Sequence, residues 1–510
     1  MAKVPAPYEA VIGLEIHVQL ATQSKMFCRC RNLAGADASQ AEAAPNSATC
    51  PVCLGMPGTL PVPNRTAVEW ALKTAMALGC GIPERSKFDR KQYFYPDLPK
   101  GYQISQYDEP LGGPGTFTYD LPAGPAGAEP SAGDGSENSS GNPASRTVGI
   151  TRLHLEEDAG KLIHPPGAAY SLVDLNRAGT PLMEIVTEPD LRTPAEAKRF
   201  LQELRLLMRY LGVSEAEMEK GHLRADANVS VRPSGQAELG TKTELKNLNS
   251  FKFVEKGLVA EIARQIAELE GGGTIVQETR GFDEASGETV SQRSKEGAND
   301  YRYFPEPDLP PLEPSGLGLE ALRQAIPELP SAKRLRFIAQ YGLAERQAEQ
   351  LAADPADAAF FEDVVTAAGA NAAVAEAAVK LLLGPLTEER NVSGLPFTSL
   401  PGGAGAVGQI AAYLAEGKLD WSAAKRMLAA VGQGTEPAEL IKRPEYQQAD
   451  QADLDRLIGQ ALAANPAVVE DFKFGNPNAA NVLIGAVMKQ AKGSVNPHTV
   501  KKAILKKLED

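Results

Sequence analysis

The sequence predicts an α+β protein that continues into an all-helical C-terminal region. Segments in which polar and apolar residues alternate recur through the first half of the chain, a period typical of strands with one buried face. Longer segments with helical spacing interrupt them. From about residue 317 the chain becomes rich in alanine and its pattern is helical. A chain of 510 residues is too long for one core, so we expect about three domains.

The elements of the α+β part are expected in the following order. Strands are predicted at 8–20, 88–95, 150–157, 170–175, 182–187, 226–232 and 241–248, and helices at 64–79, 194–211 and 251–269. Asn64 and Thr193 are suitable N-caps for the first two helices, and Pro194 suits the first helical position of the second. The Gly-, Pro-, Ser- and Ala-rich tract 121–145 lies between two further strand-like pieces. We interpret it as the tip of a long hairpin and a tolerated insertion.

The domain boundaries are predicted from breaks in these patterns. We expect an α+β domain at 1–295 and all-helical domains at 296–405 and 406–510. Three prolines between residues 305 and 310 exclude a regular helix soon after the first boundary. The second boundary is predicted from the Pro- and Gly-rich segment 395–407.

Composition and charge exclude several classes of protein. A net charge of -13 argues against coating nucleic acid by bulk attraction, although it permits a local basic site. The start of the sequence has no apolar run of signal-peptide length, and no segment approaches a membrane span. Five cysteines in so long a chain are no disulfide framework, so we expect a cytoplasmic protein without membrane association.

Four of the cysteines form two close pairs. They are Cys28 and Cys30, then Cys50 and Cys53. Two thiolate pairs suit tetrahedral zinc, and the segment 50–55 is similar to a zinc-knuckle turn. The alternative is four unrelated core residues. Four thiolates leave no open coordination position, so we predict a structural zinc and interpret Cys80 as a packing residue.

Acidic residues recur on one face of predicted strands whose other face is apolar. A buried carboxylate is costly unless a cation compensates it, and Mg²⁺ prefers hard oxygen ligands. We therefore predict a magnesium site from Glu15, His17, Glu157, Glu184 and Asp226. Glu156 is a weaker candidate, because adjacent residues on a strand point in opposite directions. Orienting a water or phosphate is the alternative role for His17, and a solvated strand face is the alternative for any single acid.

Basic and amide groups accompany these acids. The candidates for phosphate or nucleotide binding are Arg152, Arg224, Asn228, Ser230, Arg232 and Lys246. Arginine can bind phosphate with two hydrogen bonds, although pairing with the same acids is an equal alternative for each arginine. Metal ions and arginines without an activated Ser, Cys or Thr are typical of phosphoryl transfer. The sequence has no Gly-x-x-x-x-Gly-Lys-Ser/Thr loop, which argues against a P-loop enzyme.

Several long motifs resemble one known family. They lie at 11–18, 87–97, 102–106, 152–161, 174–190 and 244–251. Together they closely resemble the B subunit of the glutamine-dependent aspartyl/glutamyl-tRNA amidotransferases. The resemblance is dense from about residue 8 to 310 and looser beyond.

The resemblance implies a fold, an activity and partners. The fold would be a glutamine-synthetase-like catalytic cradle, then a helical domain and a tRNA-binding helical tail. The activity would be ATP-dependent phosphorylation of the side-chain carboxylate of mischarged Asp-tRNA(Asn) or Glu-tRNA(Gln), followed by amidation. Ammonia would come from an amidase A subunit in a heterotrimer with a small C subunit. A non-discriminating aminoacyl-tRNA synthetase is a further candidate partner.

The resemblance also assigns roles to residues. The five predicted magnesium ligands match the family's metal-binding positions, with Glu156 beside them. Lys91 resembles a residue where the ammonia channel reaches the kinase site. The expected catalytic residues are therefore Lys91 and two of the matching metal-binding positions, Glu157 and Glu184. Some members of the family lack the cysteines, which supports a structural role for zinc.

Lysines gather at the end of the acidic chain. Those expected to bind tRNA are Lys489, Lys492, Lys501, Lys502 and Lys506. Lys502 and Lys506 would share the outer face of a helix while Ile504, Leu505 and Leu508 pack inward. The alternative is a solvated helix whose lysines favour the C-terminal end of the helix dipole.

Three other functions compete with this interpretation. An archaeal-type relative of the same superfamily would need a large inserted domain, for which 510 residues leave little room. A zinc-stabilised tRNA scaffold would not need inward-facing carboxylates. A free-standing carboxylate–amine ligase would not need the lysine-bearing tail.

Overall fold

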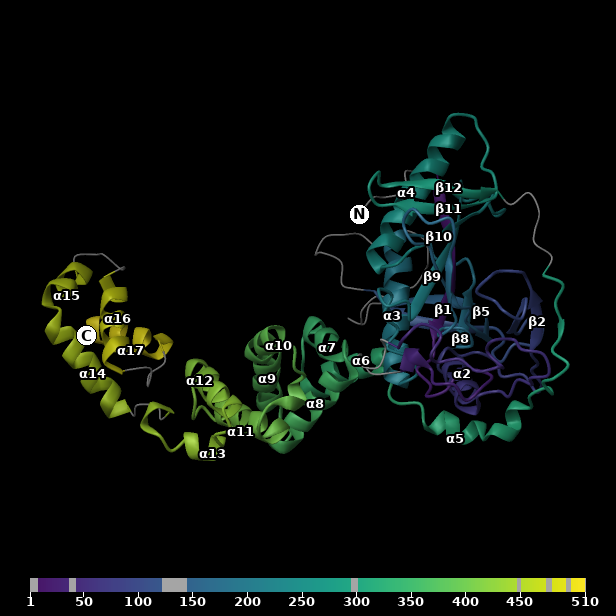
Figure 1. The fold of residues 1–510 in the computed structure, drawn as a ribbon. Coiled ribbons are helices and arrows are strands. Elements are labelled where there is room, and N and C mark those ends of the chain that lie inside the picture. Colours follow the sequence, from purple (N-terminus) through teal and green to yellow (C-terminus); the bar gives the residue numbers. More distant parts are fainter. Residues whose placement is uncertain are drawn as a thin grey trace. The chain divides into compact units, whose positions relative to one another are not determined.

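The computed structural model describes residues 8–35, 43–121, 145–294, 301–446, 451–473, 479–491 and 497–509. The chain divides into two compact units, 1–331 and 332–510 (Figure 1). The first is α+β and the second is helical in its described residues, which confirms the predicted α+β character and helical C-terminal region. The division into three domains at 295 and 405 stays a prediction. No helix in the described ranges is both long and apolar enough to cross a membrane.

Eight strands of the first unit form one sheet in the order β12-β11-β10-β9-β1-β8-β5-β4. They are β1 (Tyr8–Gln19), β4 (Gly115–Asp120), β5 (Ser145–Glu157), β8 (Pro181–Thr187), β9 (Leu223–Pro233), β10 (Thr243–Lys246), β11 (Glu278–Asp283) and β12 (Glu288–Ser294). All neighbours are antiparallel except β10 and β11, which run parallel. β4 and β5 pair with Asp120 opposite Ser145, so the predicted hairpin is confirmed. Residues 122–144 of the expected insertion lie outside the described residues.

Two small sheets accompany the large one. They are β13 (Phe304–Pro305), β2 (Asp89–Gln92) and β3 (Tyr102–Ser105) in the order β13-β2-β3, and β6 (Lys161–Ile163) with β7 (Leu172–Asp174). β3 packs beside β5, which carries several candidate site residues. The first small sheet therefore borders the candidate site.

Helices pack on the apolar face of the large sheet (Figure 1). They are α2 (Arg65–Ala77), α3 (Pro194–Leu211) and α4 (Phe251–Glu270). The first unit also contains the shorter η1 (Leu33–Gly35), η2 (Pro314–Leu317) and α5 (Leu319–Gln324), and α5 packs against α2. Ile16, Leu204 and Leu258 belong to one core formed by strands and helices together. Asn64 caps α2 through the Ala67 amide, and Thr193 forms a capping box with Glu196, so both predicted caps are confirmed.

The second unit contains two separate hydrophobic cores. Its helices are α6 (Pro330–Tyr341, which begins at the end of the first unit), α7 (Glu345–Ala352), α8 (Pro355–Ala367), α9 (Ala372–Leu381), η3 (Leu382–Leu386), α10 (Thr387–Ser393), η4 (Phe397–Ser399), α11 (Gly403–Ala415), α12 (Trp421–Gly432), α13 (Pro437–Leu440), η5 (Pro444–Tyr446), α14 (Gln451–Ala464), α15 (Pro466–Lys473), α16 (Ala479–Ala491) and α17 (Pro497–Glu509). One core runs from Phe337 to Tyr446 and the other from Leu454 to Leu508. The first of these cores includes residues on both sides of the segment 395–407, and α11 packs against α8 and α9.

Candidate functional site

Polar side chains form rows across the sheet face opposite the helices. In one row, His154 on β5, Glu184 on β8, His17 on β1 and Arg224 on β9 lie side by side. The next row contains Arg152, Val186, Glu15 and Asp226. These rows follow from the period of two, because the intervening residues belong to the core.

His17, Glu156 and Glu184 form a group that could hold a metal ion. One ligand atom from each lies within 4.8 Å of the others. His17 Nε2 is 3.3 Å from Glu184 Oε2 and 3.7 Å from Glu156 Oε1. Both carboxylates are buried, at 2% and 7% exposed. Two carboxylates and one imidazole fit a divalent cation that completes its shell with water or substrate oxygens.

A second histidine, His154, lies behind this group, and we did not predict it. Burial alone lowers its pKa, but Glu184 and Glu156 outweigh that effect and raise the pKa to about 9. Burial alone also raises the pKa of Glu184, but His154 and His17 hold it well below its usual value. The sequence did contain a signal for His154. It alternates with Leu153 and Leu155, which places it in phase with Arg152 and Glu156.

Glu156 belongs to the metal-competent group, and Glu157 does not. Glu157 Oε1 pairs with Lys100 and accepts a hydrogen bond of 3.0 Å from the Ile104 amide. Ser105 Oγ donates to Glu156 Oε2 at 3.1 Å. The structure thus brings Glu156, and not Glu157, to His17 and Glu184, because adjacent residues on a strand point in opposite directions. Binding of magnesium by Glu157 stays a prediction.

Glu15 and Asp226 lie in the next row with partners of their own. Asn228 Nδ2 donates to Glu15 Oε1 at 3.1 Å. Lys246 Nζ is 3.0 Å from Asp226 Oδ2 and 3.2 Å from Glu244 Oε1. Burial lowers the pKa of Lys246, but the two carboxylates raise it further than burial lowers it. The binding of magnesium by Glu15 and Asp226 stays a prediction.

The predicted phosphate-binding arginines pair with acids. Arg152 Nη2 lies 3.8 Å from Glu184 Oε1, and Arg224 Nη2 donates to Asp158 Oδ2 at 2.8 Å. The Nε atoms of both are buried and have no hydrogen-bond partner among the described residues. The side chains as a whole are 36% and 41% exposed, so each arginine can still meet a further ligand.

Two predicted residues lie away from the group. Arg232 Nε donates to Glu9 Oε1 at 2.5 Å, and Ser230 is buried opposite Val11. Arg232 is eight residues beyond Arg224 on β9, about 26 Å along the strand. The structure thus does not bring Arg232 to His17, Glu156 and Glu184.

Lys91 on β2 faces the metal-competent group. Its Nζ lies 5.1 Å from the ring centroid of Tyr301. Burial lowers the pKa of Lys91, but Glu156 and Glu184 contribute to raising it above its usual value. The lysine is thus a cation beside both carboxylates.

The four predicted zinc ligands come together. Their sulfur atoms all lie within 4.8 Å of one another, and Cys53 Sγ is 3.9 Å from the sulfurs of Cys30 and Cys50. Zinc–sulfur bonds of about 2.3 Å in a tetrahedron imply sulfur separations of about 3.8 Å, so the cluster fits zinc. A hydrogen bond from Cys28, aided by Lys25, lowers the pKa of Cys53 to about 4.

The loop that carries two of these thiols makes a tight turn. The Cys50 amide donates to Cys53 Sγ at 3.0 Å, and the Leu54 amide donates to the Cys50 carbonyl at 3.0 Å. Gly55 has φ +65°, and a Cβ there would meet Lys100 Cγ at 2.8 Å. This position therefore requires glycine, as in the predicted knuckle. Cys80 is buried, as expected of a packing residue.

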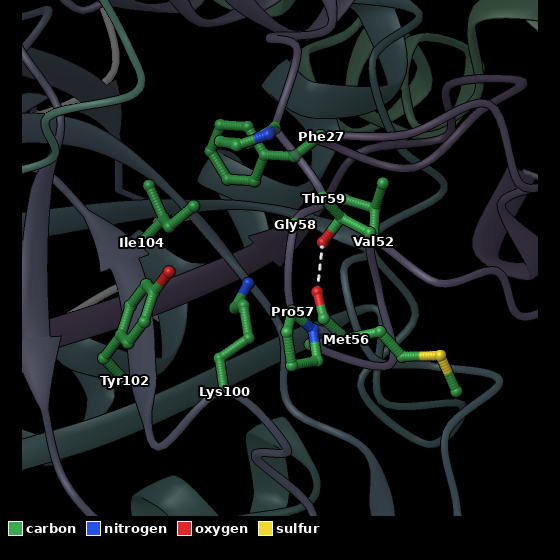
Figure 2. A pocket seen from close by; sticks show the side chains of 11 residues that line it. Phe27, Val52, Met56, Pro57, Gly58, Thr59, Lys100, Tyr102 and Ile104 are labelled. Atoms are coloured by element: carbon green, nitrogen blue, oxygen red, sulfur yellow. Dashed lines mark hydrogen bonds between the residues drawn. The ribbon is translucent and has the colours of Figure 1, made fainter.

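A pocket of about 210 Å³ lies beside the thiol loop (Figure 2). It is lined by Phe27, Val52, Gly55, Met56, Pro57, Gly58, Thr59, Pro61, Lys100, Tyr102 and Ile104. In Figure 2, Lys100 lies between Tyr102 and the loop of Met56 and Pro57. The same lysine pairs with Glu157. The pocket therefore lies between residues of the thiol loop and the lysine that pairs with Glu157.

The described tail lysines are exposed. They are Lys489 on α16 and Lys501, Lys502 and Lys506 on α17, whereas Lys492 lies outside the described residues. Ile504 and Leu508 pack inward as expected, together with Val500. Leu505 is half-buried and is not part of that core. Binding of tRNA by the exposed face stays a prediction.

Comparisons with known proteins identify the family. A model of the GatB/GatE catalytic domain matches residues 10–316, and one of the GatB domain matches residues 359–508. The B subunit of the aspartyl/glutamyl-tRNA(Asn/Gln) amidotransferase from Carboxydothermus hydrogenoformans is 45% identical over 98% of this chain and 99% of its own. The proteins of the same name from Brevibacillus brevis and Syntrophotalea carbinolica are 44% and 45% identical, each over 98% of both chains.

These matches define the class as a tRNA-dependent amidotransferase, a carbon–nitrogen ligase. Within that class, the chain belongs to the family of aspartyl/glutamyl-tRNA(Asn/Gln) amidotransferase B subunits. The resemblance that the motifs indicated is thereby confirmed.

Proposed function

We propose that the chain uses ATP to phosphorylate the side-chain carboxylate of mischarged Asp-tRNA(Asn), Glu-tRNA(Gln) or both, and that ammonia then converts it to the amide. The observation that carries the proposal is the group of His17, Glu156 and Glu184, with Lys91 and Arg152 beside it. Two buried carboxylates among cations suit phosphoryl transfer, which depends on positioning and charge neutralisation.

The reaction has two steps in this proposal. A substrate carboxylate oxygen attacks the γ-phosphorus, and the bond to the β,γ-bridging oxygen breaks to release ADP. Ammonia then attacks the carbonyl carbon, the carbon–oxygen bond to phosphate breaks, and the nitrogen loses a proton. Lys91 and the partly exposed guanidinium groups of Arg152 and Arg224 would bind phosphate oxygens.

His17, Glu156 and Glu184 would hold magnesium, and Glu15 and Asp226 with Lys246 would form the adjoining part of the nucleotide site. Bound Mg²⁺ would neutralise negative charge on the transferred phosphoryl group. We prefer Glu156 to Glu157 as the ligand, because only Glu156 shares the group. Glu157 would instead position Lys100 at the pocket. The large sheet would act as the glutamine-synthetase-like cradle.

The proposed partners follow from what the sequence lacks. It has no evident Ser-Ser-Lys arrangement with which to release ammonia from glutamine. We therefore propose an amidase A subunit and a small C subunit as partners in a heterotrimer, with mischarged tRNA as substrate and the cytoplasm as the compartment. The four cysteines would hold a structural zinc.

Nucleotide turnover tests the proposal. ADP release by the assembled enzyme, measured without glutamine, should require ATP, Mg²⁺ and a mischarged tRNA. Correctly charged tRNA is the matched control, because it lacks the free side-chain carboxylate. Equal ADP release with both tRNAs would contradict the proposed phosphorylation.

A further inference from the structure

His154 is a buried histidine between two carboxylates of the proposed metal site. It is 3% exposed, and its Nε2 lies 3.3 Å from Glu184 Oε2 and 3.8 Å from Glu156 Oε2. Its Nδ1 is buried without a hydrogen-bond partner among the described residues. All of its polar contacts given by the structure are therefore with these two acids.

The two histidines of this row occupy different positions. The side chain of His17 is 22% exposed, and that of His154 is 4% exposed. The mutually close ligand atoms belong to His17, Glu156 and Glu184. His17 is accessible as a ligand, whereas His154 lies behind the carboxylates.

The oxygens of Glu156 are divided between the two histidines. Oε2 receives a hydrogen bond from Ser105 at 3.1 Å and lies nearest His154. Oε1 is 3.7 Å from His17. Because Ser105 and His154 hold Oε2, the other oxygen, Oε1, remains available to a cation bound beside His17.

We propose that His154 is a positioning residue that fixes Glu156 and Glu184 for divalent-cation binding. This inference rests on the proposed metal site. Partners that orient metal-ligating side chains typically contribute about 10–100-fold to metal affinity. A purely structural ion pair would change stability without changing the affinity of the folded protein for the metal.

Mn²⁺ binding to the full-length chain in the assembled enzyme tests the inference, with free Mn²⁺ measured by electron paramagnetic resonance. His154→Leu should weaken binding about 10–100-fold. His154→Gln should retain affinity within a few-fold, because its amide nitrogen can occupy the place of Nε2. Leu153→Ala is the matched control: it loses a buried contact on the opposite face of the same strand and should leave Mn²⁺ affinity unchanged.

Pulsed measurements of nitrogen coupling to bound Mn²⁺ separate a ligand from a positioning residue. The histidine coupling should survive in His154→Gln and disappear in His17→Gln. Loss of coupling in His154→Gln would overturn the inference, because His154 would then be a ligand. Unchanged or tighter Mn²⁺ binding by His154→Leu would also overturn it. No Mn²⁺ binding by the wild-type chain would overturn the metal site itself.

Discussion

Glu184 lies between two histidines on neighbouring strands, and its carboxylate is almost excluded from water. His17 Nε2 and His154 Nε2 are both 3.3 Å from its Oε2. Arg152 approaches its other oxygen. This concentration of cations around one buried carboxylate makes Glu184 the residue on which the proposed site depends most.

Glu184→Gln should keep the fold and lose phosphoryl transfer. The amide has the shape of the carboxylate but not its charge, so metal binding and charge neutralisation should fail. We expect ADP release that depends on mischarged tRNA to fall by about 10²-fold or more. Glutamine hydrolysis by the proposed amidase partner, measured in the same preparation, should largely survive. Amidation by this variant at a rate near that of the wild type would contradict the assignment.

Residue patterns predicted which face of the sheet is polar, but not every member of the site. His17 and Glu184 could be identified because apolar residues flank them on both sides. The register of β5 is regular from Arg152 to Glu157, so the alternation of Leu153 and Leu155 with Arg152 and His154 places Glu156 on the polar face, and the prediction of Glu157 did not follow that alternation. His154 could have been found from the same alternation.

At the scale of elements, the ordered conformation of the loop that carries Cys50 and Cys53 should depend on bound zinc. Cys50→Ser removes one of four thiolates, so the purified chain should lose most of the roughly one equivalent of zinc expected. The loop at 50–59 should then become accessible to protease. Cys80→Ser is the control and should retain full zinc. A wild-type chain without zinc, with all its thiols reactive, would exclude this role.

Glu261 attaches helix α4 to the strands beneath it. Fully buried, it accepts hydrogen bonds from Thr243, Thr289 and Gln265 and pairs with Arg264. Glu261→Gln should destabilise this attachment by about 1–3 kcal/mol, because buried donors lose a charged acceptor. Hydrogen exchange of the α4 amides should accelerate accordingly. Glu270→Gln, exposed at the end of the same helix, should not change it.

The stabilisation that Glu261 gives to the attachment of α4 should also depend on pH. Burial alone raises its pKa, but Arg264 and the hydroxyl and amide donors lower it below its usual value. The stabilisation is therefore complete above the unfolded pKa of about 4.3 and is lost as pH falls through the lower folded pKa. The difference in α4 exchange between wild type and Glu261→Gln should accordingly shrink below about pH 4. A difference that grows on acidification would contradict this account.

Helices could be predicted from the sequence more completely than strands. Local signals such as Asn64, Thr193 and Pro194 define where α2 and α3 begin. Short strands such as β3 and β13 carry no such signal, because pairing with β2 defines them. β11 likewise depends on parallel pairing with β10.

At the scale of the whole molecule, the last core defines where the tail can be removed. The preceding core continues to Tyr446, so a cut at residue 408 would remove part of α11 and expose it. Removal of residues 447–510 should leave that core intact and weaken tRNA binding. Binding should also depend less on salt, because fewer phosphate contacts release fewer counterions.

A charge variant tests the same tail without deletion. Replacing Lys501, Lys502 and Lys506 with alanine should reduce the slope of log affinity against log salt by about 2–3, if each contacts one phosphate. Lys380→Ala, in an exposed ion pair with Glu376, is the control. Unchanged affinity and salt slope in both tail variants would show that the tail does not hold the tRNA.

The central claim is that a side-chain carboxylate of the substrate is activated as an acyl phosphate. Mischarged tRNA carrying ¹⁸O in both oxygens of that carboxylate tests it most directly, with ATP, glutamine and the assembled enzyme. Phosphorylation followed by attack of ammonia leaves one carboxylate oxygen on the released phosphate. We therefore predict one ¹⁸O in the inorganic phosphate for each amide formed, measured by mass spectrometry. Amide formation with phosphate that contains no ¹⁸O would contradict the claim.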